Sequence, residues 1–274
     1  MSIELINELV EYSRSCLPRS SVTKLAKISK QIIRGKFASD EDLYISLPDG
    51  NVLILPISQL PEVWLNILHI YCFKDYTPSI EFIPKPRWVV IDLGAYIGIY
   101  TLYALGLMGW NGTVLAVEPN PLAVQYLRMN IDINGLSDSV IIEPIAITSN
   151  TGYTELYVSE YWGTSTLFKD YLKRYGYKFR KHKVRTLKVD ELVRKYNLSK
   201  IDLMKIDVEG SEELIINDLW RTLRHTLVER IVIEVHRHVS STYNLMLKLR
   251  SLNYEVWIRD LGLENQLFIY AIKY

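Results

Sequence analysis

Hydrophobic positions near the start of the chain follow a helical period first and an alternating one afterwards. In residues 3–34, apolar side chains recur at spacings of three and four, the period of an amphipathic helix. Pro18 interrupts this stretch, which favours two helices over one. Residues 44–55 then predict a strand, an Asp-Gly turn and a second strand, and residues 62–73 predict a further helix.

After Pro86 the pattern changes to short β-branched runs with helical stretches between most of them. Nearly continuous apolar runs such as 89–91 and 231–233 are typical of parallel strands, because helices cover both faces of such a sheet. This alternation predicts the α/β class, with a doubly wound, mostly parallel sheet. Seven strands are expected, at 88–93, 113–118, 140–142, 201–206, 230–235, 255–259 and 267–272. We therefore expect a helical and β-hairpin accessory region in residues 1–86 and an α/β domain in residues 87–274.

The first strand of this domain ends in a glycine-containing turn, DLGAYIG, that is typical of a ligand site. Gly94 permits close approach of the backbone to a ligand, and Gly98 lets the next helix pack near the strand. Dinucleotide sites have the spacing G-x-G-x-x-G, whereas this turn has G-x-x-x-G preceded by Asp92. An acid there repels a pyrophosphate and suits a ligand with an ammonium group, which favours S-adenosylmethionine over NAD. A tight turn without a ligand is the alternative.

Carboxylates end two further predicted strands. Glu118 ends the second strand, where it can accept both hydroxyls of a ribose or cap the following helix. Lys205, Asp207 and Glu209 alternate along the fourth strand and so share one face of it. Burial of such residues is costly unless they pair with each other or with a ligand. They therefore predict a ligand site or, alternatively, a salt-bridge cluster.

Composition narrows the class of protein. Apolar residues make up 49% of the chain and charged residues 23%, which is ordinary for a globular protein. A formal net charge of +1 indicates no overall attraction to nucleic acid or membrane. We expect no signal peptide and no membrane-spanning segment. Because Cys16 and Cys72 lie far apart, we expect no disulfide-stapled fold and a reducing, cytoplasmic location.

Residues 173–185 interleave lysines and arginines with aromatic side chains and contain no acid. This combination suits a phosphate-bearing or single-stranded nucleic-acid ligand, since charge binds the backbone and rings stack on bases. A solvated surface insert is the simpler alternative. The candidate substrate-binding residues are Lys181, Lys183 and Arg185, together with Ser165 of an upstream polar loop.

Five ordered motifs resemble the FkbM-type methyltransferases. They are DLGAYIG (92–98), VEPNP (117–121), LRMNIDING (127–135), KIDVEGSE (205–212) and IEVH (233–236), and the fourth is the most specific. The resemblance covers roughly residues 87–260. It implies a class I, Rossmann-like, S-adenosylmethionine-dependent methyltransferase, usually an O-methyltransferase that acts on a sugar, polyketide or related hydroxyl. Residues 1–86 match only loosely and would form a cap around the substrate entrance.

The resemblance also implies roles for individual residues. The expected cofactor site comprises Asp92, Gly94, Ala95, Tyr96 and Gly98 around the methionine portion, Glu118 and Pro119 at the ribose, Ile145 and Ala146 beside adenine, and Asp207. Tyr96 departs from the family pattern, which often has a smaller polar residue there. Asp207, Glu209 and His236 would face the methyl-transfer point, with Lys205 compensating their charge.

Transfer of a methyl group to a hydroxyl needs an oriented acceptor and a base for its proton. Asp207, Glu209 and His236 are all candidate bases. The favoured function is O-methylation of a sugar, glycan or small-molecule acceptor, anionic ones included. An RNA methyltransferase that uses residues 173–185 and an inactive cofactor-binding partner module are the alternatives. We expect no metal, because only His236 and His238 are close in sequence among the five histidines, and a homodimer is left open.

Overall fold

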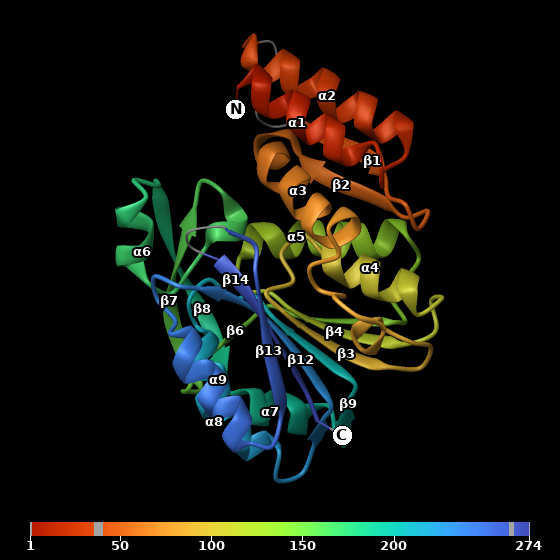
Figure 1. Ribbon diagram of the computed structural model, residues 1–274. Helices are drawn as coiled ribbons and strands as arrows, with labels where there is room; N and C mark the ends of the chain where they lie inside the picture. Colours follow the sequence, from red (N-terminus) through yellow and green to blue (C-terminus); the bar gives the residue numbers. More distant parts are fainter. Residues whose placement is uncertain (1, 36–40, 263–265, 274) are drawn as a thin grey trace.

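A seven-stranded sheet forms the centre of the molecule, described here as a computed structural model of residues 2–35, 41–262 and 266–273 (Figure 1). Its strand order is β13-β14-β12-β10-β3-β4-β5. The strands are β3 (Val89–Leu93), β4 (Thr113–Val117), β5 (Val140–Glu143), β10 (Leu203–Ile206), β12 (Arg230–His236), β13 (Glu255–Asp260) and β14 (Gln266–Ile272). Among them, β14 runs antiparallel to both neighbours and the other pairings are parallel. The predicted doubly wound, mostly parallel sheet is therefore confirmed.

Helices cover both faces of the sheet and give it two separate cores. On one face lie α4 (Ile99–Leu107) and α5 (Pro121–Ile133), and on the other α7 (Val189–Lys195), α8 (Glu212–Thr222) and α9 (Thr242–Ser251). Successive strand residues alternate between these cores: Val90 packs with the first group and Ile91 with the second. This alternation follows from the pleat of the strand.

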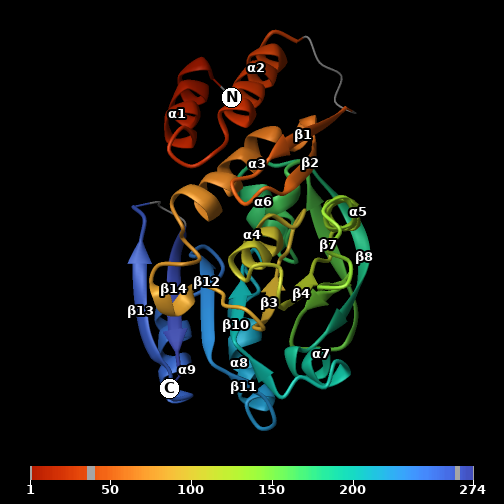
Figure 2. The same ribbon diagram turned by 90° about the vertical axis from the view of Figure 1, so that its right-hand side faces the viewer.

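The N-terminal elements lie beyond one end of the strands in both views (Figures 1 and 2). They are α1 (Ile3–Ser13), α2 (Arg19–Ile33), β1 (Asp42–Ser46), β2 (Val52–Pro56), a 3-10 turn (Ile57–Gln59), α3 (Leu60–Ile67), a π-helical turn (Leu68–Cys72) and a further 3-10 turn (Ile80–Phe82). The predicted helix break at Pro18, the hairpin and the third helix are all present. We call residues 2–35 and 41–86 the cap.

The cap shares a hydrophobic core with the sheet domain. Leu25 and Trp64 of the cap belong to the same buried cluster as Leu102 of α4. Polar contacts reinforce the join, since in β2 the amide of Ile54 donates to the side chain of Asn130 in α5 and the amide of Val52 donates to that of Asn134, the C-cap of α5. The division of the chain at residue 86 stays a prediction, and the cap packs as part of one folded body.

Cys16 and Cys72 form a disulfide within the cap, with their Cα atoms 5.3 Å apart. The expectation of a chain without a disulfide staple is therefore wrong. The two cysteines are separated by 56 residues, and the packing of α1 against the π-helical turn brings them together. Such a contact is tertiary, so the spacing of two cysteines in the sequence does not reveal it.

A second, three-stranded sheet was not predicted. It has the order β6-β8-β7 and contains β6 (Ala146–Ile147), β7 (Gly152–Ser159) and β8 (Phe179–Leu187). A 3-10 turn (Trp162–Thr164) and α6 (Lys169–Arg174) lie between β7 and β8, and a small pair joins β9 (Lys200–Ile201) to β11 (Leu227–Val228). Much of the basic segment 173–185 is therefore strand. In the described part of the chain, we find no helix with the length and hydropathy needed to cross a membrane.

Candidate active site at the carboxyl ends of the strands

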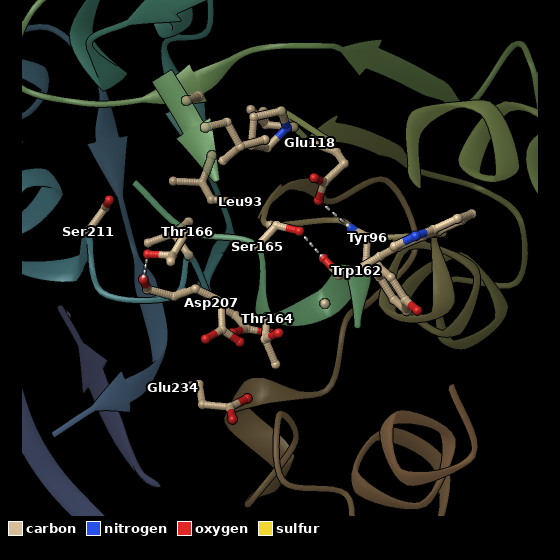
Figure 3. A pocket seen from close by; sticks show the side chains of 18 of the residues that line it. Leu93, Tyr96, Glu118, Trp162, Thr164, Ser165, Thr166, Asp207, Ser211 and Glu234 are labelled. Atoms are coloured by element: carbon tan, nitrogen blue, oxygen red, sulfur yellow. Dashed lines mark hydrogen bonds between the residues drawn. The ribbon is translucent and has the colours of Figure 1, made fainter. Parts of the chain in front are cut away.

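A cavity of about 250 Å³ lies where the central strands end, between the sheet domain and the cap (Figure 3). In doubly wound sheets this edge is where ligands bind. The predicted residues that line it are Gly94, Tyr96, Glu118, Pro119, Ile145, Ala146, Ser165, Asp207 and Glu209. The sequence motifs thus converge on one place, and the remaining predicted residues lie behind its wall or outside it.

The turn after β3 is built so closely against the end of β10 that it requires glycine. Gly94 has φ of +79°, and a Cβ atom there would lie 1.7 Å from the carbonyl oxygen of Asp207. Gly98, with φ of +93°, opens α4, and a Cβ atom there would lie 2.7 Å from Leu127 of α5. The first glycine therefore joins two strand ends at the cavity, and the second allows two helices to pack.

Glu118 follows β4 and is held in the cavity wall by the backbone. The amide of Tyr96 donates to Oε2 at 2.8 Å (Figure 3). The amide of Asn120 donates to Oε1 at 2.7 Å. Burial raises the pKa of Glu118 to about 7, although these two amides oppose the shift. Both carboxylate oxygens are thus fixed in orientation on one side of the cavity.

Lys205 is a buried cation behind the opposite wall. Its Nζ donates to the carbonyl of Gly94 at 2.6 Å and lies 3.1 Å from Asp92 and 3.4 Å from Asp207. Burial lowers its pKa, but the two carboxylates outweigh that effect and the net shift is upward. A single positive charge therefore ties the β3 turn to the end of β10.

Asp92 lies behind the cavity wall. It is fully buried and accepts a hydrogen bond from Thr101 at 2.7 Å, and burial raises its pKa. Ala95 and Gly98 likewise lie outside the cavity lining. Their contribution to a cofactor site would act through the position of the turn, and it stays a prediction.

Asp207 and Glu234 are linked by a tyrosine from the cap. The hydroxyl of Tyr76 contacts Oδ2 of Asp207 at 3.1 Å and Oε2 of Glu234 at 2.5 Å. Burial, followed by the charge of Asp207, raises the pKa of Glu234 to about 7. Two carboxylates from neighbouring strands therefore face the same end of the cavity (Figure 3).

His236 ends β12 between two glutamates. Its Nδ1 lies 2.8 Å from Glu212 and its Nε2 lies 3.3 Å from Glu209. Burial lowers the pKa of His236, but the two carboxylates outweigh it and raise the pKa well above its usual range. Of the three candidate bases, Asp207 and Glu209 line the cavity, whereas His236 lies behind Glu209.

Sequence reasoning missed the part of the site that the cap supplies. Glu62 of α3 accepts from the Tyr96 hydroxyl at 3.1 Å and from the amides of Gly163 and Thr164. Burial raises its pKa to about 7. A glutamate in an amphipathic helix carries no local signal of such a role, because only packing of the cap onto the sheet brings it there.

The predicted substrate-binding residues divide into two groups. Ser165 lines the cavity and donates to the carbonyl of Trp162 at 2.7 Å. Lys181, Lys183 and Arg185 lie on the exposed face of β8, outside the cavity lining. Lys181 is 2.8 Å from the exposed Glu155. The structure therefore does not bring the basic residues to the cavity.

Residues 92–256 match the family model described as "Methyltransferase FkbM domain". The chain belongs to this methyltransferase family. The match confirms the resemblance seen in the sequence motifs. It includes Glu118, Asp207 and Glu234 but not Glu62 or Tyr76, so the cap contributes to the site from outside the FkbM domain.

Individual relatives agree with the family and the fold. The methyltransferase sdnD of Sordaria araneosa is 28% identical over 199 residues, which cover 62% of this chain and 76% of that protein. The METTL16 methyltransferase domain aligns with a TM-score of 0.50 at 14% identity, over 91% of this chain and 79% of that one, which shows a shared fold. Methyltransferase FkbM from Methylobacillus flagellatus KT aligns with a TM-score of 0.46 and 14% identity over 78% of this chain, which spans about half (54%) of that protein.

Proposed function

We propose that this protein is an S-adenosylmethionine-dependent methyltransferase that methylates a hydroxyl group on a sugar, glycan or small-molecule acceptor. The observation that carries the proposal is the arrangement of carboxylates in the cavity, with Glu118 on one side and Asp207 and Glu234 on the other (Figure 3). Glu209 also lines the cavity. Membership of a methyltransferase family supports the reaction class.

The residues of the cavity fit this cofactor. S-adenosylmethionine supplies an electrophilic methyl group on a sulfonium, and it also carries an ammonium and a ribose. Glu118 has both oxygens oriented by backbone amides and retains acceptor capacity for ribose hydroxyls. The carboxylate of Asp207, beside the glycine turn, suits the positive charges of the methionine portion.

The acceptor oxygen would bind on the Asp207 and Glu234 side. Bound S-adenosylmethionine would supply the methyl group there, with the C–S bonding pair left on sulfur as the C–O bond forms, and a carboxylate of the protein would take the hydroxyl proton. Asp207 and Glu209 line the cavity and His236 does not, so we favour a carboxylate over His236 as the base.

The charge of the cavity favours a neutral or cationic acceptor. Five carboxylic residues line it, and among the described lining residues there is no lysine or arginine. A phosphate would meet repulsion from these carboxylates unless a bound metal ion compensated it, because His69, the basic side chain among the described lining residues, is already paired with Asp75. Without such an ion, the charge of the cavity argues against anionic acceptors and against the RNA methyltransferase alternative, whose basic residues lie on β8 outside the cavity.

Calorimetric titration with S-adenosylmethionine, and in parallel with NAD, tests the proposal. We expect the first ligand alone to bind, and Glu118→Ala to weaken its binding by about 1–3 kcal/mol because ribose hydroxyls lose their acceptors. The matched control is Glu155→Ala, an exposed glutamate of β7. Absence of binding would support the inactive-module alternative, and an unchanged affinity of Glu118→Ala would refute the ribose assignment.

A cytoplasmic location stays a prediction. Disulfides are rare in reducing compartments, so a Cys16–Cys72 disulfide present in cells would argue against that location. Mass analysis after alkylation of thiols in freshly lysed cells would decide, since two alkylated cysteines support the cytoplasm.

A further inference from the structure

One nitrogen and two carboxylate groups converge on the acceptor side of the cavity. Ligand atoms of Asp207, Glu209 and His236 all lie within 4.8 Å of one another. Asp207 and Glu209 come from the turn after β10, and His236 comes from the end of the neighbouring β12. We propose that these three side chains bind one divalent transition-metal cation, Mn²⁺ or Zn²⁺. The proposal rests on the methyltransferase function for its purpose, but its binding test does not.

His236 provides the observation that distinguishes this cluster from a group of acids. Its side chain is 2% exposed, and its Nε2 has no hydrogen-bond partner. On the other side of the ring, Nδ1 meets the fully buried carboxylate of Glu212 at 2.8 Å. A carboxylate accepts there, so we assign one proton to Nδ1. Nε2 holds a second proton in the imidazolium, and it offers a lone pair once a cation displaces that proton.

Nε2 faces the carboxylate of Glu209, 3.3 Å away. Two electron-rich atoms in a buried place require a cation or a proton between them. The chain Glu212–His236–cation is also the arrangement in which a buried carboxylate fixes the tautomer of a metal-binding histidine. Ser240 donates a second hydrogen bond to Glu212, which further fixes this orienting group.

Access and ligand type narrow the choice of ion. The side chains of Asp207 and Glu209 are 20% and 13% exposed and line the cavity, so an ion bound by them would have open positions toward the acceptor. Mg²⁺ and Ca²⁺ favour oxygen ligands, whereas an imidazole with carboxylates suits Zn²⁺ and also Mn²⁺. Lys205 and Tyr76 both contact Oδ2 of Asp207, so ligation falls to Oδ1.

Such an ion would hold the oxygen of the acceptor and polarise its O–H bond. The ion would add a positive group to a cavity whose described lining holds five carboxylic residues and no lysine or arginine. It also restricts acceptors to those with an oxygen donor in reach of the ion, such as a hydroxyl with a neighbouring oxygen on a sugar ring.

Two titrations of chelator-stripped protein test the site without S-adenosylmethionine. Binding of Mn²⁺ is monitored by electron paramagnetic resonance, and binding of Zn²⁺ by calorimetry. We expect one ion per chain, and a Kd raised at least tenfold by Glu209→Gln and by His236→Gln. Glu212→Gln should raise the Kd by about 10–100-fold, since it removes only the orienting group. The matched control is His238→Gln on the segment after β12, which lies outside the cluster and should not change the Kd.

Thermal unfolding of each variant shows whether it is folded. Glu209→Gln lies at the edge of the cavity and is therefore the variant that we expect to disturb folding least. No binding of either ion to the wild-type protein overturns the proposal and leaves a proton as the partner of Nε2. Binding that all three variants retain overturns it as well. A titration of the same samples with S-adenosylmethionine separates the two ideas, because either ligand can bind when the other fails.

Discussion

The two sides of the cavity are built in different ways. The wall consists of strand ends, where Glu118 is fixed by backbone amides and Asp207 by the buried Lys205. The roof comes from the cap, where Glu62 reaches the site only because α3 packs across it. The wall therefore depends on the local geometry of the strand ends and on the ion pairs of the buried Lys205. The roof depends on tertiary packing and on the disulfide.

The largest expected effect comes from removing the cation of the wall. Lys205→Met leaves Asp92 and Asp207 without their counter-charge, which should cost about 3–5 kcal/mol in the free energy of unfolding. Lys200→Met is the control, because Lys200 is 47% exposed and its ion pairs should be worth no more than about 1 kcal/mol. Urea unfolding measures both. Equal losses in the two variants would show that the wall does not depend on its buried charge.

The wall could be predicted from sequence because its signals are local. Apolar β-branched runs identify the strands, and parallel strands place their ends at one edge. Glycines and acids at those ends, such as Gly94, Glu118 and Asp207, therefore predict a site before any contact is known. Local signals do not show how deeply a side chain is buried. Asp92, for example, belongs to the same motif as Gly94 but lies behind the cavity wall.

The roof and the second sheet could not be predicted in the same way. Glu62 and Tyr76 become site residues only through the packing of the cap, and nothing near them in the sequence marks this. In the sequence, β8 looks like a basic segment and not like a strand, because its exposed charged residues stand between partly buried positions. The Cys16–Cys72 contact likewise depends on the fold of the cap.

Removal of the disulfide tests the roof. With 56 residues between the cysteines, Cys16→Ser should lower the free energy of unfolding by roughly 2–4 kcal/mol, since the unfolded chain gains conformational freedom. A reductant should shift the melting temperature of the wild-type protein to a similar extent and leave Cys16→Ser unchanged. If the reductant has no effect on the wild-type protein, the cap is held by packing alone.

Glu62 links the roof to pH. Burial raises its pKa from 4.5 to about 7, so the folded protein retains a proton that the unfolded chain loses between those values. The contribution of Glu62 to stability therefore falls as pH rises from 4.5 to 7 and is constant above. Glu62→Gln removes this dependence, and its stability relative to the wild type should rise across the window by up to about 3 kcal/mol. Unfolding curves from pH 4 to 8 measure it, with the exposed Glu8→Gln as control; parallel curves for Glu62→Gln and the wild type would contradict it.

The smallest effect should come from the basic face of β8, which belongs to neither side of the cavity. Reversal of Lys181 and Lys183 to glutamate replaces one exposed ion pair, worth no more than about 1 kcal/mol. S-adenosylmethionine should bind to this variant as it does to the wild type, because neither lysine lines the cavity.

The same variant decides between acceptor classes. If the reversal abolishes a salt-dependent affinity for single-stranded RNA and methylation of that RNA, the RNA alternative holds. Methylation of a neutral glycan at an unchanged rate would instead show that the acceptor is recognised by the carboxylates of the wall, with the basic strand as solvated surface.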